Sequence, residues 1–296
     1  MSAVVAEGVS GLESPRFIRA NDLQFAYLEA GEGPLVICLH GFPDTAWSFR
    51  PLLAELAAAG FRAVAPFLRG YGPTDLAPDD DYSLLALGRD VIALMEHFAV
   101  PTASLVGHDW GAAIAYAAAT MRPDRISRFA AAAVPHPRRY LLRPSWDQLR
   151  ASSYMLKFQF PGWADRRIPA NNYEWLRAMI QRWSPRWRFG EPELALLKAA
   201  IGEPRRLRAA LRYYRAIPWA LLHAEAWSTL LQPVRVPVLQ IYGTEDGCIL
   251  PKTFAGSEHL HAARYELAGI ERAGHFMHIE AADEFAAQVI RFLKSS

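Results

Sequence analysis

The sequence predicts an α/β protein in which a mostly parallel β-sheet is covered by helices and interrupted by an inserted helical module. Apolar, β-branched runs of strand length alternate with helical patterns over the first half of the chain, which favours a parallel sheet with both faces covered. This alternation stops near His136 and resumes near Val234. The intervening segment has the pattern of helices and proline-rich loops. It also contains seven of the nine tryptophans of the chain.

Six strands are expected, and they follow one another along the chain. The first should be antiparallel and the others parallel, because helical patterns separate several of the later runs. The expected strands cover residues 23–30, 34–40, 61–67, 103–109, 126–134 and 236–243. The helices between them are each ended by Gly, Pro or the start of a new strand, and they cover residues 51–60, 84–100 and 110–122.

The change of pattern divides the chain into an α/β core, residues 1–136 and 234–296, and an inserted helical cap, residues 137–233. A length of 296 residues fits one core with an insertion. The cap holds 17 Lys and Arg against 7 Asp and Glu, a net charge of +10, whereas the remainder holds 15 against 23, a net charge of −8. Solvated helix faces and attraction between cap and core account for this asymmetry, with steering of an anionic substrate as the alternative.

Composition indicates an ordinary globular protein. Hydrophobic residues make up 52% of the chain, charged residues 21%, and the formal net charge is +2, which argues against disorder and against a polyionic protein. The chain has no basic, apolar leader pattern and no run of 18 apolar residues, so we expect a cytoplasmic protein with no membrane and no nucleic-acid partner. Cys38 and Cys248 lack metal-ligand spacing and are expected to be buried thiols, so no metal site is predicted.

The sequence GHDWG at residues 107–111 carries the first candidate for catalysis. It follows an expected strand and opens a helix of small residues, which is the setting of a nucleophile elbow. The elbow normally presents a serine, whereas this chain has Asp109, so the covalent intermediate would be an alkyl ester and not an acyl-enzyme. The competing interpretation is that Asp109 only caps the following helix.

Further residues supply the remaining parts of such a site. The loop HGFP at residues 40–43 follows an expected strand, and the backbone N–H groups of Phe42 and Trp110 are the candidate oxyanion donors. A plain turn is the other interpretation of this loop.

The candidate base and its orienting acid come later in the chain. Asp246 follows the strand expected at residues 236–243, and His275 precedes the last helix. Nucleophile, acid and histidine in this chain order are typical of enzymes with an elbow of this kind. Glu245 is a rival for the acid, and His278 is the local competitor for the base.

These motifs, with RGYGPTD at residues 69–75 and GHF at residues 274–276, resemble the soluble epoxide hydrolase family over nearly the whole chain. The resemblance implies the α/β-hydrolase fold with an inserted cap. It also implies that a small-molecule epoxide is converted to a vicinal diol without metal or cofactor, by a monomer or homodimer. Asp109 would form an ester with the substrate, and water activated by His275 and Asp246 would hydrolyse it.

The resemblance extends to two lid tyrosines. SYMLKFQFPG at residues 153–162 resembles the segment that bears the first lid tyrosine of the family, and YYR at residues 213–215 resembles the second. By position, Tyr154 and Tyr214 would hold and protonate the epoxide oxygen. Neighbouring residues of a helix point about 100° apart, so only one of Tyr213 and Tyr214 can face the nucleophile. The family pattern places the functional tyrosine directly before Arg, which selects Tyr214.

Two other functions compete with epoxide hydrolysis. Haloalkane and fluoroacetate dehalogenases also use an elbow Asp with a His and a carboxylate. The former typically carry Asn where this chain has Phe42; the latter resemble GHDRG with a further Arg, where this chain has Trp110 and Ala113. A catalytically silent ligand-binding protein could share the fold, but it would be expected to have lost a site residue.

Overall fold

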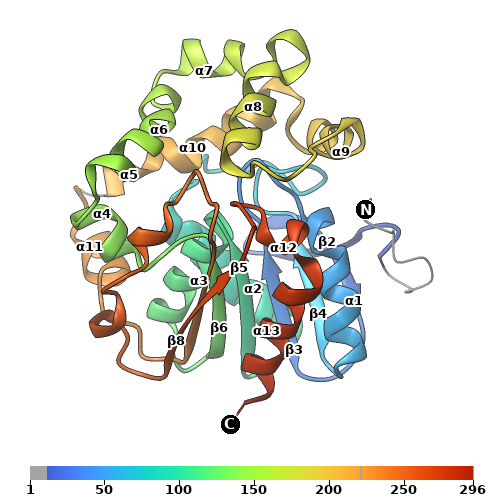
Figure 1. Ribbon diagram of the computed structural model, residues 1–296. Helices are drawn as coiled ribbons and strands as arrows, with labels where there is room; N and C mark the ends of the chain where they lie inside the picture. Colours follow the sequence, from blue (N-terminus) through green and yellow to red (C-terminus); the bar gives the residue numbers. More distant parts are fainter. Residues whose placement is uncertain (1–11, 221, 296) are drawn as a thin grey trace.

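A computed structural model describes residues 12–220 and 222–295 of the chain (Figure 1). Its centre is an eight-stranded sheet with the order β1-β2-β4-β3-β5-β6-β7-β8. β2 pairs antiparallel with β1 and β4, and all other neighbouring strands are parallel. The strands are β1 (Arg16–Ala20), β2 (Leu23–Ala30), β3 (Leu35–Leu39), β4 (Arg62–Pro66), β5 (Ala103–His108), β6 (Ile126–Ala132), β7 (Val238–Gly243) and β8 (Tyr265–Ile270).

The predicted α/β architecture is confirmed, and so is the antiparallel first strand of the prediction, which is β2. The six expected strands correspond to β2–β7. The prediction missed β1 and β8, which form the two edges of the sheet. Exposed residues interrupt β1, and only Ile270 of β8 is fully buried, so neither strand carries the apolar run of a central strand.

Both faces of the sheet are covered by helices because successive side chains of each strand point to opposite sides. Ile37 and Leu39 of β3 belong to a buried cluster with α2 and α3, whereas Val36 and Cys38 belong to a cluster with α1 and α13. These helices flank the sheet in Figure 1. Their bounds are α1 (Arg50–Ala58), α2 (Leu84–His97), α3 (Trp110–Met121) and α13 (Ala282–Lys294), with a short α12 (Met277–Glu280) before the last.

Between β6 and β7 the chain leaves the sheet and forms a helical lid, which lies above the carboxyl ends of the parallel strands in Figure 1. Among the described residues, no helix is both long and apolar enough to cross a membrane. The lid helices are α4 (Pro137–Leu142), α5 (Trp146–Ala151), α6 (Ser153–Phe158), α7 (Pro161–Arg167), α8 (Ala170–Trp183), α9 (Glu191–Ile201), α10 (Pro204–Ala220) and α11 (Ala224–Leu230). Short 3₁₀ turns occur at Ala46–Phe49, Pro251–Thr253 and Glu258–Leu260.

Candidate active site

Asp109 occupies a sharp turn between β5 and α3. Its backbone angles are φ 53° and ψ −118°, a left-handed conformation that non-glycine residues rarely adopt. Such conformations persist where the surrounding structure enforces them, and they cluster at functional sites. The Asp109 side chain makes no capping hydrogen bond to α3, so the structure does not support the interpretation of this residue as a helix cap.

Glycines permit the close approach of three segments around this turn. A Cβ atom on Gly111 would lie 1.8 Å from the carbonyl oxygen of Leu39, and one on Gly107 would lie 2.2 Å from that of Gly111. A Cβ atom on Gly41 would lie 2.3 Å from Oδ1 of Asp109. Gly41 therefore leaves the space into which the Asp109 carboxylate projects.

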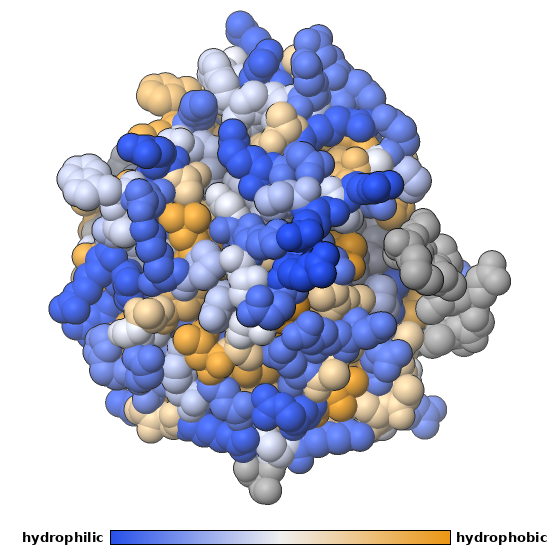
Figure 2. Space-filling model, in the orientation of Figure 1, coloured by the Kyte–Doolittle hydropathy of each residue, from blue (hydrophilic) through white to orange (hydrophobic). Residues whose placement is uncertain are grey.

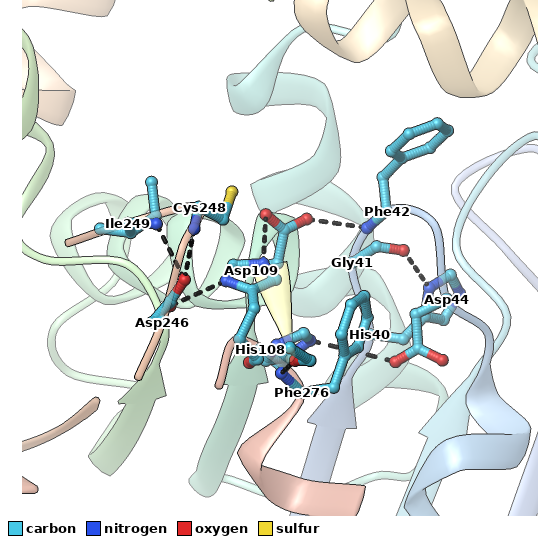
Figure 3. A network of polar contacts seen from close by, with 12 residues as sticks. His40, Gly41, Phe42, Asp44, His108, Asp109, Asp246, Cys248, Ile249 and Phe276 are labelled. Carbon is cyan, nitrogen blue, oxygen red and sulfur yellow. Dashed lines mark hydrogen bonds and ion pairs between the residues drawn. The ribbon is translucent and has the colours of Figure 1, made fainter. Parts of the chain in front are cut away.

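One of the two expected oxyanion donors contacts this carboxylate. The N–H of Phe42 donates a hydrogen bond of 2.7 Å to Oδ1 of Asp109 (Figure 3). The N–H of Trp110 makes no hydrogen bond to the carboxylate. The Phe42–Pro43 peptide bond, whose isomer the sequence leaves open, is cis.

His275 lies between two carboxylates. Its Nε2 is 3.5 Å from Oδ2 of Asp109, and its Nδ1 is 2.9 Å from Oδ2 of Asp246. Asp246 also accepts hydrogen bonds of 2.7 and 3.0 Å at Oδ1 from the N–H groups of Cys248 and Ile249 (Figure 3). With Asp246 held in this way, the His275 ring is oriented with Nε2 toward Asp109.

The two rival residues make different contacts. Glu245 forms two hydrogen bonds of 2.7 Å with Arg186, away from His275. His278 is buried, and its Nε2 lies 3.2 Å from Oδ2 of Asp44. The structure thus brings Asp109, His275 and Asp246 together and leaves Glu245 and His278 outside this group.

The two carboxylates next to His275 raise the pKa of its imidazole. Burial lowers the pKa of His275, but the charge of Asp246, the hydrogen bond to Asp246 and the close approach of the Asp109 carboxylate outweigh it and raise the pKa to about 10. The free site therefore holds a protonated imidazole next to Asp109 at neutral pH. Loss of the negative charge on Asp109 would remove part of this stabilisation and make His275 a stronger proton donor.

Two lid tyrosines face the same space as Asp109. Tyr154 and Tyr214 line a pocket with Asp109, and their ring centroids are 5.9 Å apart. Among the described residues, the buried Tyr214 hydroxyl has no hydrogen bond of normal geometry and lies next to the Trp110 side chain, and the Tyr154 hydroxyl lies 3.6 Å from Sγ of Cys248. Burial, with the nearby negative charge of Asp109, raises the pKa of both phenols well above its usual value, so both keep their proton.

Tyr213 differs from its neighbour although it also lines the pocket. Its hydroxyl donates a 2.8 Å hydrogen bond to the carbonyl oxygen of Arg69. This bond fixes Tyr213 to the core loop, whereas the Tyr214 hydroxyl is available to a ligand. The geometry therefore favours Tyr214, in agreement with the position before Arg215.

The pocket is a cavity of about 910 Å³, including its mouth, between the lid and the elbow. Asp109 is the one charged residue among those that line it in the described part of the chain. The other lining side chains are apolar or aromatic, among them Trp110, Met155, Ile217 and Ile249. Such a pocket accommodates an apolar, uncharged molecule with its reactive atom near Asp109.

Gln148 is a buried lid residue whose part in the site the sequence does not reveal. Its Nε2 donates hydrogen bonds of 2.9 Å to the carbonyl oxygen of Cys248 and 2.8 Å to Oγ of Ser152. Its Oε1 accepts from the N–H of Leu250 and the hydroxyl of Thr253, both at 2.9 Å. Helix α5 is thereby tied to the loop that follows Asp246. A single glutamine in a six-residue helix forms no sequence pattern from which this contact could be predicted.

A second group of polar residues lies behind His275. The Nε2 atom of His108 is 2.8 Å from the carbonyl oxygen of His275, and its Nδ1 faces Asp44 at 3.9 Å. Among the described residues, Asp44, His108 and His278 are the group whose donor atoms lie close enough together, within 4.8 Å, to hold a metal ion. Asp44 already accepts hydrogen bonds from the N–H of Thr45 and the hydroxyl of Ser48, which satisfy its carboxylate without an ion.

Both cysteines, Cys38 and Cys248, are buried, as expected.

Comparison with known proteins gives consistent results. A family profile described as alpha/beta hydrolase fold matches residues 34–282. The chain is 31% identical to an epoxide hydrolase of Caballeronia sordidicola over 94% of this chain and 93% of the relative, and 29% identical to epoxide hydrolase A of Mycobacterium tuberculosis over 96% and 98%. A crystal structure of an epoxide hydrolase from Vigna radiata superimposes with a TM-score of 0.81 at 28% identity, covering 95% of this chain and 97% of the other.

Proposed function

The chain belongs to the epoxide hydrolases of the alpha/beta hydrolase fold, and from this membership we propose that it opens an epoxide to a vicinal diol through a covalent ester on Asp109. The observation that carries the proposal is the position of the Asp109 carboxylate. It lies between the Phe42 N–H and the His275 ring, at the foot of an apolar pocket lined by Tyr154 and Tyr214.

In the first step, an oxygen of Asp109 attacks one epoxide carbon and forms an ester bond while the carbon–oxygen bond of the ring breaks. The Tyr154 and Tyr214 hydroxyls donate hydrogen bonds to the epoxide oxygen, and one of the two transfers its proton to this oxygen as negative charge develops. Buried phenols with raised pKa values suit this role because they remain protonated, so that no water is needed to supply the proton.

In the second step, water attacks the carbonyl carbon of the ester, and the Phe42 and Trp110 N–H groups stabilise the oxyanion. His275 takes a proton from this water, and Asp246 stabilises the resulting imidazolium. The bond between the carbonyl carbon and the diol oxygen then breaks, the imidazolium returns its proton to that oxygen, and the diol leaves. Asp109 is restored as a carboxylate when its own proton passes to His275. The raised pKa of His275 depends in part on the charge of Asp109, which the ester neutralises. Once the ester has formed, His275 passes its proton to the tyrosine that protonated the epoxide oxygen, and the neutral imidazole can act as the base.

The lid participates in the proposed reaction. We propose that residues 137–233 form a functional cap on the core of residues 1–136 and 234–296, because both tyrosines come from the cap and the nucleophile from the core. All these residues belong to one chain, so a monomer and a homodimer would each carry complete sites. No step requires a metal or a cofactor, and a cytoplasmic location remains a prediction.

The competing functions receive less support. A haloalkane dehalogenase would have Trp110 available as a halide donor in this pocket, but Phe42 stands where the second donor, Asn, is typical, and the paired tyrosine hydroxyls suit an epoxide oxygen. A fluoroacetate dehalogenase also needs a cation for the substrate carboxylate, and the described pocket lining contains none. A non-catalytic binding protein would not require the joint arrangement of nucleophile, base and acid.

A panel of substrates tests the proposal. The purified full chain is mixed in parallel with styrene oxide, a fatty epoxide, a short haloalkane and fluoroacetate, and diol or halide release is followed. We expect diol from one or both epoxides and no halide. Halide release with no diol would assign the chain to the dehalogenases, and no turnover of any compound would favour the non-catalytic protein.

A further inference from the structure

The outer surface of helices α4–α7 exposes an unusual number of large apolar side chains. Trp146 is 87% exposed, Leu156 69% and Phe160 65%, and three others on these helices are also exposed. They make up six of the eleven large hydrophobic side chains that are exposed among the described residues. We call this surface the lid face, and its apolar residues are Leu142, Trp146, Leu149, Leu156, Phe160 and Trp163.

Cations are interspersed with these apolar residues. Residues 138–167 contain seven Arg and Lys against two Asp. Both acids are paired, Asp147 with Lys252 and Asp165 with Arg215. The exposed cations of the lid face are Arg138, Arg143, Arg150, Lys157, Arg166 and Arg167.

The helices that carry these residues form one continuous edge of the lid. α5 packs against α6 and α6 against α7, and α4–α7 follow one another along that edge in Figure 1. Figure 2 shows hydrophobic and hydrophilic residues interleaved on the upper left of the molecule, where these helices lie. The lid face is therefore one mixed apolar and basic surface.

We infer that the lid face docks on an anionic phospholipid surface, from which the enzyme takes apolar epoxides. Exposed Trp, Phe and Leu among Arg and Lys is the composition of surfaces that lie at the boundary of head groups and acyl chains. The cations favour an anionic partner and oppose a second copy of the same face. Docking of this kind needs no membrane-spanning run, so the inference departs from the expectation of no membrane partner.

The same lid helices connect this surface to the pocket. On α4, Leu141 lines the pocket and Leu142 is exposed; on α6, Met155 lines the pocket and Leu156 is exposed. An apolar epoxide dissolved in the bilayer would thus lie one helix layer from the pocket. The substrate part of the inference rests on the proposed function, whereas the docking part does not.

Flotation with lipid vesicles tests the docking. The full chain is mixed with vesicles of phosphatidylcholine alone or of equal parts phosphatidylcholine and phosphatidylglycerol, at low and at high salt. We expect flotation with the phosphatidylglycerol vesicles only, and release at high salt because screening weakens the attraction of the cations. Absence of flotation at low salt would overturn the inference.

Variants locate the surface. Trp146→Ala and Phe160→Ala should each weaken partitioning by roughly tenfold through loss of buried apolar area. Arg166→Gln should weaken it by about fivefold. Phe17→Ala is the matched control, because Phe17 is 51% exposed but lies on β1, and it should leave partitioning unchanged. Equal effects of all four variants would contradict the assignment to the lid face.

Two further measurements separate the possible outcomes. Light scattering shows whether the chain self-associates; a dimer that Trp146→Ala dissociates, without vesicle binding, would identify a second copy as the occupant and overturn the inference. Diol formation is then compared for an epoxide held in vesicles and for a water-soluble epoxide. Vesicle binding without turnover of any epoxide would reject the proposed function alone, and faster turnover of the vesicle-held epoxide only in the unmutated protein would support both.

Discussion

His275 interacts electrostatically with both carboxylates of the site. Two carboxylates lie within 3.5 Å of its ring nitrogens, and their attraction exceeds the cost of burying the imidazolium. The two carboxylates differ in their contacts: Asp246 accepts two backbone N–H groups, whereas Asp109 accepts one and faces the pocket. This difference leaves Asp109 as the group that can react and Asp246 as the group that orients.

Replacement of His275 by Gln should trap the ester. The first step requires Asp109 and the tyrosines, whereas the second requires a base, so hydrolysis should slow by roughly 10²–10⁴-fold. Intact-protein mass spectrometry after mixing with excess epoxide should show the added mass of one substrate, on the peptide that contains Asp109. If no adduct forms, and if ¹⁸O from labelled water enters the first diol released by the unmutated enzyme, His275 activates water directly at the epoxide.

The paired tyrosines should respond unequally to loss of a hydroxyl. Tyr154→Phe and Tyr214→Phe should each slow ester formation by about a hundredfold, because each removes a donor to the same oxygen. Tyr213→Phe removes the bond to the Arg69 carbonyl and should cost about 1 kcal/mol of stability with little change in this rate. Rapid-mixing measurement of ester formation checks the order, and a larger loss from Tyr213→Phe than from Tyr214→Phe would exchange their roles.

At the scale of elements, helix α5 couples the lid to the loop that carries Asp246. Gln148 contacts the backbone of Cys248 and Leu250, and the Cys248 N–H donates to Asp246. The Sγ atom of Cys248 lies near the Tyr154 hydroxyl on the following lid helix. A displacement of α5 would therefore reach both the orienting acid and one of the proposed proton donors.

Gln148→Met should weaken this connection while preserving side-chain volume. The free energy of unfolding should fall by roughly 2–3 kcal/mol because several buried groups lose their partners. Ester hydrolysis should slow by about tenfold because Asp246 is held less firmly. Gln240→Met is the matched control: Gln240 is equally buried and bonded to Tyr116 and Tyr265, so its loss should lower stability without changing the ester hydrolysis rate. Equal effects on the rate would reduce Gln148 to a purely structural residue.

The elements differ in how far the sequence predicts them. Central strands such as β3 and β5 are continuous apolar runs, and the elbow at Asp109 follows one of them directly, so both can be identified from local pattern. The edge strand β8 lacks such a run because one side of it has no neighbour. The bond of Gln148 to the loop 248–253 joins residues about a hundred positions apart, and nothing local in the sequence encodes that pairing.

The whole molecule combines a basic lid with an acidic core. Direct ion pairs between the two parts neutralise few of these charges. Arg186 pairs with Glu245 and Arg212 with Asp80 across the boundary, at solvent-accessible positions where such pairs contribute little to stability. Most lid cations therefore face solvent and remain available for long-range attraction of an anionic partner.

Stability should depend on pH through His275. Its pKa is raised from 6.5 to about 10 on folding, so the native chain binds more protons than the unfolded chain between these values. The stabilisation is complete below pH 6.5 and is lost as pH rises through 10, on the order of 5 kcal/mol in total. Denaturant unfolding across this range should show a decline that His275→Gln reduces. An identical decline in both proteins would contradict the raised pKa.

The apolar lining of the pocket also bears on what happens after the chemistry. Opening of an epoxide adds a second polar group, and the lid tyrosines can hydrogen-bond one hydroxyl of the resulting diol, whereas the apolar walls offer the other no partner. Water can satisfy those hydroxyls, so the product should leave the cavity more readily than the reactant. Product inhibition should accordingly be weak, and the enzyme should turn over steadily while diol accumulates.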